Sequence, residues 1–592
     1  MMGESVVTPR TLKGTRGSPG IAIGLAYVVD RGKIKVPMRL IMPKLVPFEK
    51  ARFRTSIHTS LRQLETALDR EIGDDHKEIL DAHLAWLSDE YMIREVETLI
   101  ESERINAEWA VKKLLDQLIA SIDAGTESER QARSDLFHEV GDRIIRNLMG
   151  AQQESVETVP EGVILVAHDF TPADMAHVDR TRVAGMAMDI GGPTSHTCIL
   201  ARGMELPTIV GLDHVSNEVQ TGDVLVLDAD DGRVYVNPPL AVLDDYQERA
   251  RRLDEQLQEL LKLKDVECKT ADGVSIQLQA NIELLEELGI MEEHGIKDIG
   301  LFRSEFLFLM KGGAADEDEQ YELYSLLLRN LGPEHCVTIR TLDLGWDKVY
   351  AGMDMQPETN PAMGLRAIRF CLDREDLFKD QLRALLRASI HGRMRIMFPM
   401  ISGIDELREA KNILEEVQQE LELEGAAYSD NVEIGIMIEV PSAVMMADIL
   451  ADEADFFSIG TNDLIQYSLA IDRENEHVAH LYTPAHVAIL RMIESTVKAG
   501  RAAGIEVAMC GEMAGDIQMT MLLLGLGVTC FSANPPAALK VKQLIRKIDT
   551  AEARNFAKRV MALSSSEDIA NFIRREMNKR YPEIFANHNW TI

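Results

Sequence analysis

The sequence predicts a multidomain α/β protein whose C-terminal part is a (β/α)8 barrel. At 592 residues the chain is too long for one hydrophobic core, since single cores stop growing at about 250–300 residues. Its first 239 residues change from strand-like to helical and back to strand-like, which predicts a β/α domain with an inserted helical bundle. The remainder repeats a short apolar run eight times, and most of these runs are followed by a helical stretch. That repeat is typical of a (β/α)8 barrel.

The β/α domain is expected in two parts, residues 1–42 and 152–239. Glycine and proline separate short apolar runs in "GTRGSPGIAIGLAYVVD", "EGVILVAHDFTP" and "DVLVLDADDGRVYVNPP", as they do between strands. Residues 43–151 have few prolines and helical apolar spacing, which predicts about four helices. The spacing is seen at Ile79, His83, Leu84 and Leu87, and again at Val111, Leu114, Leu115 and Leu118.

A helical linker and the barrel account for the rest of the chain. Residues 240–267 are charged and lack glycine and proline, so we predict a semi-rigid helix centred on 240–264. Residues 268–592 contain the eight apolar runs, which are "IQLQANIE", "DIGLFRSE", "VTIRTLDLG", "MRIMFPM", "IGIMIEVPS", "FFSIGTNDL", "EVAMCGEMAG" and "CFSANPPA". In a (β/α)8 barrel, residues at the C-terminal ends of the strands form the active site.

The composition narrows the function further. The formal net charge of −34 argues against a nucleic-acid partner. The six cysteines form no CxxC pair, so a disulfide framework or zinc site is not expected. The N-terminus shows no signal-peptide core, and no apolar run is long enough to span a bilayer. A cytoplasmic protein is the expectation.

Four arginines lie at or just beyond predicted strand ends: Arg303, Arg340, Arg366 and Arg473. Guanidinium groups that converge on one mouth would suit a multiply anionic ligand, because their planar forks match phosphate and carboxylate oxygens. The alternative for any one of them is an ordinary surface arginine paired with one of the many acids.

Two carboxylates and a thiol end other strands. Glu439 and Asp463 end successive strands and could share a Mg²⁺ with phosphate oxygens; they could equally accept hydrogen bonds from loop backbone. Cys510 follows "VAM" and precedes a glycine. It is either a small buried hydrophobe or an acid–base group.

His196 stands in "DIGGPTSHTCILARG". A helix that starts near Ser195 would stabilise a phosphoryl group on the imidazole ring and would favour the neutral, nucleophilic ring. Taken alone, the stretch is more typical of a capping or core histidine than of a nucleophile.

Together these motifs resemble enzyme I of the bacterial phosphoenolpyruvate:sugar phosphotransferase system, the phosphoenolpyruvate-protein phosphotransferases. The resemblance extends over nearly the whole chain and rests on long motifs, which are "SPGIAIG", "GGPTSHTCILARGMELPTIVG", "GLFRSEFLF", "RTLDLG", "NPAMGLRAIR", "IGIMIEVPSA", "FFSIGTNDLIQY" and "CGEMAGD".

The resemblance implies a role for each strand-end residue. It makes His196 the residue whose Nε2 carries the phosphoryl group, and Cys510 the acid that protonates the enolate to give pyruvate. It makes Glu439 and Asp463 the Mg²⁺ ligands. The residues that it assigns to phosphoenolpyruvate binding are Arg303, Arg340, Arg366, Asn462, Asp463 and Arg473.

The resemblance also implies partners and motion. The helical block, with "ILDAHLAWLSDEY" and "GDRIIRNLMG", is similar to the family's docking domain for the small carrier protein HPr. The family acts as a homodimer through the barrel half. Because His196 precedes the barrel by a linker, we expect a swivelling N-terminal phosphohistidine domain, with the 240–264 helix near the hinge.

Two alternatives remain at this stage. A pyruvate phosphate dikinase or phosphoenolpyruvate synthase would need an ATP-binding domain, yet residues 1–150 have no glycine-rich phosphate loop. A non-catalytic phosphohistidine scaffold would lack the strand-end groups. We expect no N-terminal sensory domain of the nitrogen-regulatory branch, since "GSPGIAIG" comes too early. Pro193, where many relatives carry Arg or Ser, is a departure that removes no reacting group.

Overall fold

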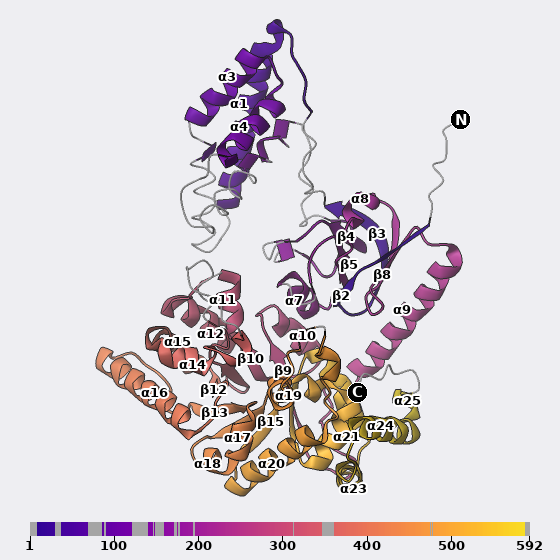
Figure 1. The fold of residues 1–592 in the computed structure, drawn as a ribbon, viewed down its shortest axis with the longest axis vertical. Coiled ribbons are helices and arrows are strands. Elements are labelled where there is room, and N and C mark those ends of the chain that lie inside the picture. The colour runs from indigo at the N-terminus through magenta and orange to yellow at the C-terminus, as the bar shows by residue number, and fades with distance from the viewer. Residues whose placement is uncertain are drawn as a thin grey trace. The chain divides into compact units, whose positions relative to one another are not determined.

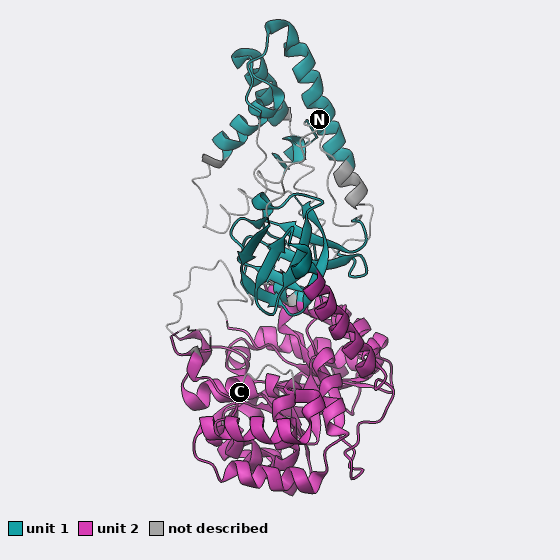
Figure 2. Ribbon diagram, turned by 90° about the vertical axis from the view of Figure 1, so that its right-hand side faces the viewer, with its two compact units in different colours: residues 1–201, 206–243 teal, residues 202–205, 244–592 magenta. Residues whose placement is uncertain are grey.

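The computed structural model forms two compact units, residues 1–201 with 206–243 and residues 202–205 with 244–592 (Figure 2). The domain boundaries given above stay predictions. The structure describes residues 9–29, 37–68, 86–87, 90–120, 140–141, 143–145, 147–148, 159–170, 174–175, 178–192, 196–311, 313–345, 360–473, 475 and 477–585.

A mixed eight-stranded sheet forms the β/α part of the first unit (Figure 1). Its strands are β1 (Arg10–Lys13), β2 (Thr15–Ser18), β3 (Ile21–Val29), β4 (Val163–Ala167), β5 (Val183–Met188), β6 (Thr208–Val210), β7 (Val224–Asp228) and β8 (Arg233–Val236). They lie in the order β1-β8-β7-β3-β4-β5-β6-β2. The central run β3-β4-β5-β6 is parallel, and the other pairs are antiparallel. Parallel pairing of β3 with β4 joins the two sequence segments that flank the helical insertion.

The inserted segment is helical where the structure describes it. Its helices are α1 (Val46–Leu68), α3 (Glu90–Glu103) and α4 (Ala107–Ala120), preceded by the short η1 (Pro43–Leu45). Residues 140–148 are helical at the positions described, and Val140, Ile144 and Ile145 pack into the same apolar core as Phe53. This agrees with a bundle of about four helices. Ile79, His83 and Leu84, and with them most of "ILDAHLAWLSDEY", lie outside the described residues.

The predicted linker helix is α9 (Leu240–Leu261), 22 residues long. Most of its side chains are exposed, and salt bridges such as Arg251–Glu248 run along its surface. A polar helix without prolines keeps its shape through such pairs. None of the helices in the described ranges combines the length and apolarity that a bilayer span requires.

Eight parallel strands close into a barrel in the second unit. They are β9 (Gln277–Ile282), β10 (Asp298–Arg303), β11 (Cys336–Arg340), β12 (Arg393–Phe398), β13 (Glu433–Ile438), β14 (Phe456–Ile459), β15 (Glu506–Met509) and β16 (Cys530–Ala533). Each strand coincides with one of the eight apolar runs, so the (β/α)8 prediction is confirmed. The closed order makes all eight C-terminal strand ends meet at one mouth.

The helices of the second unit form an outer layer around the barrel (Figure 1). They are α10 (Glu287–Glu293), α11 (Glu305–Lys311), α12 (Glu317–Leu331), α14 (Ile368–Asp373), α15 (Glu375–Ala388), α16 (Ile404–Glu424), α17 (Pro441–Met445), α18 (Ala447–Ala451), α19 (Thr461–Leu469), α20 (Val487–Ala503), α21 (Ile517–Leu526), α22 (Pro535–Ile545), α23 (Thr550–Met561), α24 (Ser566–Arg580) and α25 (Pro582–Phe585). Short turns of 3-10 helix are η3 (Pro361–Met363), η4 (Ser389–His391), η5 (Ala479–Leu481) and η6 (Glu512–Gly515).

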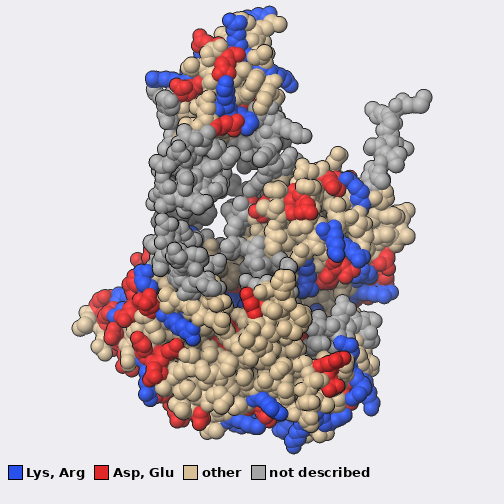
Figure 3. Space-filling view, viewed as in Figure 1, with Lys and Arg blue, Asp and Glu red and all other residues tan. Residues whose placement is uncertain are grey.

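Two apolar cores support the mouth. A large core lies between the strands and the helices, and α21, whose sequence "IQMTMLLLGL" is almost entirely apolar, is buried within it. A second, small cluster consists of side chains from five different strands or strand ends, which places it inside the barrel: Leu301, Met397, Met437, Phe456 and Cys510. Charged side chains of both signs lie over the outer surface seen in Figure 3, with acidic side chains gathered at the left edge of the second unit.

Candidate functional site

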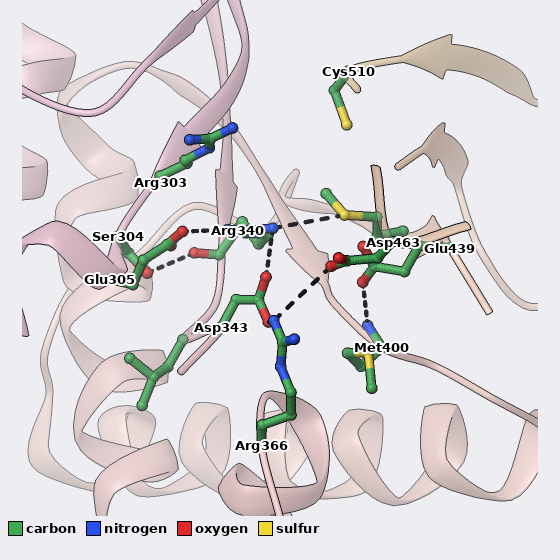
Figure 4. Close-up of polar contacts among 12 residues, drawn as sticks. Arg303, Ser304, Glu305, Arg340, Asp343, Arg366, Met400, Glu439, Asp463 and Cys510 are labelled. Carbon is green, nitrogen blue, oxygen red and sulfur yellow. Dashed lines mark hydrogen bonds and ion pairs between the residues drawn. The ribbon is translucent and has the colours of Figure 1, made fainter. Parts of the chain in front are cut away.

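The predicted strand-end residues of the barrel gather at its C-terminal mouth (Figure 4). Arg303 and Arg340 are the last residues of β10 and β11. Glu439 directly follows β13, and Cys510 directly follows β15. Asp463 lies in the first turn of α19, behind β14. Five strands therefore deliver two arginines, two carboxylates and a thiol to one place.

Arg340 lies between two buried carboxylates. Its Nη2 donates to Oε1 of Glu305, and its Nη1 lies 2.6 Å from Oδ2 of Asp343. Burial by itself would lower the pKa of Arg340, but these two carboxylates outweigh it and hold the pKa well above its ordinary value. The guanidinium is therefore permanently charged, and contacts on both sides fix its direction.

Asp343 extends this contact to Arg366. Nη2 of Arg366 lies 2.8 Å from Oδ1 of Asp343 and 3.9 Å from Oδ2 of Asp463. Its Nη1 donates to the hydroxyl of Tyr467 at 3.3 Å, and that hydroxyl donates to the carbonyl of Ala362 at 2.6 Å. One buried carboxylate thus positions two arginines that stand 26 residues apart in the sequence.

Arg303 is paired with a carboxylate on the neighbouring strand. Its Nη1 donates to Oε1 of Glu283, which follows β9. Its Nε is buried and has no hydrogen-bond partner among the described residues. Burial opposes the charge of Arg303, but the carboxylate of Glu283 outweighs it and raises the pKa.

Glu439 and Asp463 form a carboxylate pair. Burial first, and then the charge of Asp463, raise the pKa of Glu439 to about 8. Oε1 of Glu439 accepts from the backbone N–H of Met400 at 2.7 Å, and Met400 has a positive φ of 57°. Such a backbone conformation is costly for a non-glycine residue and is held here by the surrounding contacts.

This pair fits a divalent cation. Oδ1 of Asp463 is buried without a hydrogen-bond partner in the described chain. A Cβ on Gly460 would lie 2.8 Å from Oε2 of Glu439, so only glycine leaves that oxygen accessible. No group of three or more His, Cys, Asp or Glu among the described residues is arranged to hold a metal. Two carboxylates match Mg²⁺, which takes few protein ligands and completes its shell with water and phosphate oxygens.

Cys510 is a buried, protonated thiol. Its side chain belongs to the cluster inside the barrel, and the sulfur points toward the arginines and carboxylates in Figure 4. Burial raises the pKa of this thiol to about 11. Gly511 follows at once, and a Cβ there would lie 1.9 Å from Oγ1 of Thr461. A thiol that keeps its proton at neutral pH can donate it, which suits a general acid.

Asn462 and Arg473 lie at the edge of the site. Oδ1 of Asn462 accepts from the backbone N–H of Glu512 at 3.0 Å, so its amide holds the loop that follows Cys510. Arg473 is exposed, and its Nη1 lies 3.6 Å from Oδ1 of Asp463. Asn462 is therefore already engaged within the protein, whereas Arg473 is open to solvent.

His196 is the first residue of α7 (His196–Gly203), as the predicted helix start requires. Its side chain and residues 193–195, including Pro193, lie outside the described residues. Next to it, Oγ1 of Thr197 donates to the carbonyl of Phe170 at 2.6 Å. This bond ties the start of α7 to the segment after β4. His196 belongs to the first unit, whereas the other site residues belong to the second.

Sequence reasoning missed three contributors to the site. Glu283 pairs with Arg303 but lies in the acid-rich stretch "NIELLEELG", where no signal distinguishes it from its neighbours. Glu305 pairs with Arg340 and stands in "GLFRSEFLF", a motif in which only Arg303 was assigned a role. Asn281 donates through Nδ2 to the carbonyl of Cys510 at 2.8 Å and was also missed. Its place near the end of the first barrel run is the signal that could have identified it. Asp343 stands three residues after Arg340 in "RTLDLG", and no role was predicted for it.

Comparison with known proteins shows which protein families and structures the chain is similar to. Models of the phosphoenolpyruvate-utilising enzymes match it in three parts: the N-terminal part at residues 13–132, the mobile domain at 159–232 and the phosphoenolpyruvate-binding domain at 257–550. A solution structure of Enzyme I is 34% identical and covers 41% of this chain and 99% of its own, with a TM-score of 0.33.

Curated relatives match over almost their whole length. The phosphoenolpyruvate-protein phosphotransferases of Staphylococcus carnosus and Haemophilus influenzae are each 38% identical, over 95% of this chain and 98% of theirs. That of Geobacillus stearothermophilus is 38% identical over 97% of this chain and 99% of its own. The resemblance inferred from the motifs is thereby confirmed, and the chain belongs to the phosphoenolpyruvate-protein phosphotransferase family of phosphoenolpyruvate-utilising enzymes.

Proposed function

We propose that the chain transfers the phosphoryl group of phosphoenolpyruvate to its own His196 and then to a histidine of HPr, releasing pyruvate. The observation that carries this proposal is the combination at one barrel mouth of charged arginines, a carboxylate pair and a protonated thiol. An anion site, a cation site and a proton donor are what the breakdown of an enol phosphate requires.

The chemical steps follow from the groups present. Nε2 of His196 attacks phosphorus, and the bond from phosphorus to the enol oxygen breaks. The electron pair left on the enolate returns through its carbon, which takes the proton from Sγ of Cys510 to give pyruvate. Solvent then reprotonates the thiolate, whose raised pKa favours the protonated form.

The arginines neutralise charge in this scheme. Arg303 and Arg340 bind phosphate oxygens, Arg366 and Arg473 complete the anion site, and Asn462 and Asp463 border it. The four arginines are paired with four acids, Glu283, Glu305, Asp343 and Asp463, so these pairs leave no net positive charge. A trianionic substrate therefore calls for a cation. Mg²⁺ held by Glu439 and Asp463 would supply two positive charges and polarise the phosphate.

His196 and the barrel mouth lie in different units, so transfer requires them to meet. We infer that the first unit swivels, docking HPr through its helical part in one state and delivering His196 to the barrel in another, with α9 near the hinge. A homodimer through the barrel half and a cytoplasmic location belong to the same proposal. The dikinase and scaffold alternatives are not favoured, since the full-length relatives are protein phosphotransferases.

The test is incubation with phosphoenolpyruvate labelled in the phosphoryl group, with Mg²⁺, followed by mapping of the label. We expect acid-labile label on His196, transfer to added HPr, and dependence on Mg²⁺. His196→Ala should abolish labelling, while His214→Ala, in the same β/α part, should not. Label on another residue, or none on the wild type, would refute the proposal.

A further inference from the structure

The ion pair between Arg303 and Glu283 differs from the other ion pairs at the barrel mouth. Glu283 has one partner of this kind: among the described residues, only Arg303 contacts its carboxylate through a hydrogen bond or ion pair. Asp343, by contrast, holds two arginines at once. Glu305 also has one such partner among the described residues, Arg340, so exposure is what distinguishes Glu283 from it.

Solvent exposure separates the Glu283–Arg303 pair from the pairs that Glu305 and Asp343 form with arginines. The side chains of Glu283 and Arg303 are 21% and 30% exposed, whereas those of Glu305 and Asp343 are 8% and 4% exposed. A carboxylate that already touches water can leave its partner without being stranded in the interior, whereas a buried one pays a large penalty.

The backbone beneath Glu283 is anchored independently of its side chain. Oε2 of Glu287 accepts from the N–H of Glu283 at 2.6 Å and from the N–H of Leu284 at 2.8 Å. The turn after β9 therefore keeps its shape when the Glu283 side chain rotates. A rotamer change of a partly exposed side chain needs no movement of the barrel.

The guanidinium of Arg303 has further N–H donors available for a ligand. Its Nη1 is engaged by Glu283, while its buried Nε lacks a hydrogen-bond partner in the described part of the chain. A guanidinium carries five N–H donors in a fixed fork, and that fork suits two oxygens of one phosphate. Glu283 occupies part of this fork in the structure.

We propose that Glu283 sets the affinity of the barrel mouth for phosphate-bearing ligands by competing with them for Arg303. The inference rests on the proposed function, in which Arg303 binds the phosphate of phosphoenolpyruvate. A phosphate of charge near −2 displaces the single carboxylate. Once the phosphate has been transferred, the Glu283 carboxylate pairs with Arg303 again, and anions that bind more weakly do not displace it from the guanidinium.

The test compares two substitutions on the same turn. Glu283→Gln removes the competing charge, and Glu286→Gln removes an identical charge from an exposed side chain three residues away. In Glu283→Gln we expect the KM for phosphoenolpyruvate, and the Kd for inorganic phosphate measured by calorimetry, to fall about fivefold, the size of a favourable ion pair at a partly exposed site. We expect kcat to change less than about twofold, because the Glu283 carboxylate competes for Arg303 with the bound substrate and with the transition state alike. Glu286→Gln should leave all three unchanged.

Other outcomes overturn the inference. An equal fall in both variants would mean that general electrostatics, not displacement, controls affinity. No change in Glu283→Gln would mean that Glu283 does not compete with the ligand for Arg303. Weaker binding in this variant would mean that Glu283 positions Arg303. Should that variant fold poorly, Glu283→Asp keeps the charge on a shorter arm and should bind phosphate more tightly as well. Because calorimetry with inorganic phosphate needs no turnover, a failed labelling of His196 would refute the proposed function separately.

Discussion

Replacing Cys510 with alanine should separate the two halves of the reaction. The thiol is 3% exposed and has a pKa of about 11. At pH 7.5, well below that pKa, the thiol keeps its proton in almost every molecule. Only formation of pyruvate from the enolate needs this proton. Exchange of the phosphoryl group between His196 and HPr does not.

The expected magnitude follows from the loss of a positioned general acid, which contributes about 10²- to 10⁴-fold. Pyruvate formation should slow by about 100-fold or more in Cys510→Ala, while phosphoryl exchange should change less than about threefold. The variant should still fold, because one sulfur is removed from a small cluster, at a cost of about 1 kcal/mol.

The assay follows both half-reactions in one preparation. Pyruvate is measured by coupled reduction to lactate, and exchange is measured with labelled phosphorylated HPr. Cys530→Ala is the matched control, since Cys530 is also a buried cysteine but begins β16, at the far end of the barrel. Equal slowing of both half-reactions in Cys510→Ala would refute the reasoning and make Cys510 a structural residue.

Three further predictions test the structure around the site. Gly511→Ala should slow pyruvate formation at least tenfold and cost about 1–3 kcal/mol in unfolding free energy, because the new Cβ would meet Thr461 at 1.9 Å. Burial raises the pKa of Glu287 from 4.5 to about 7. The stability that protonated Glu287 contributes is therefore complete below pH 4.5 and is lost as the pH rises through 7. Glu287→Gln should flatten that part of the decline in urea midpoint between pH 5 and pH 8. Arg395→Ala should lower the unfolding free energy by about 3 kcal/mol, since its Nη1 lies 2.8 Å from the carboxylate of Glu506 and its guanidinium lies over a buried ring.

Each of these has an outcome that contradicts it. Full activity in Gly511→Ala would show that the loop after Cys510 tolerates displacement. A pH dependence of Glu287→Gln identical to wild type, with Glu286→Gln as the exposed control, would place the titration elsewhere. An unchanged urea midpoint in Arg395→Ala would show that the contacts of Arg395 with Glu506 and the buried ring contribute nothing to stability.

The barrel and much of its mouth could be predicted because they depend on local pattern. Eight apolar runs separated by helical stretches predict eight parallel strands, and closure brings their C-terminal ends together. Arg303, Arg340, Glu439 and Cys510 stand directly at those ends, so their convergence follows from the fold class alone. Long motifs around them made the family recognisable before any coordinate was known.

Other features of the site depended on loops whose path no local pattern encodes. The role of Asn462 as a ligand residue stays a prediction, and the hydrogen bond from the N–H of Glu512 to its Oδ1 could not be predicted from the sequence. Asp343 stands three residues after Arg340 in the sequence, but its second partner, Arg366, comes from a separate segment. Such pairings depend on side-chain direction after the chain has left the strand.

For His196, the sequence predicted both a helix start and the expected chemistry, and the structure confirms the helix start. Sequence alone determined the order of the domains, the barrel and the strand-end groups, because periodicity and strand ends are local properties. Only the tertiary structure decided which of the 97 acidic residues face the arginines. Ion pairing depends on distance and burial between segments far apart in the chain, and Glu283 and Glu305 became visible only when the barrel brought neighbouring strands together.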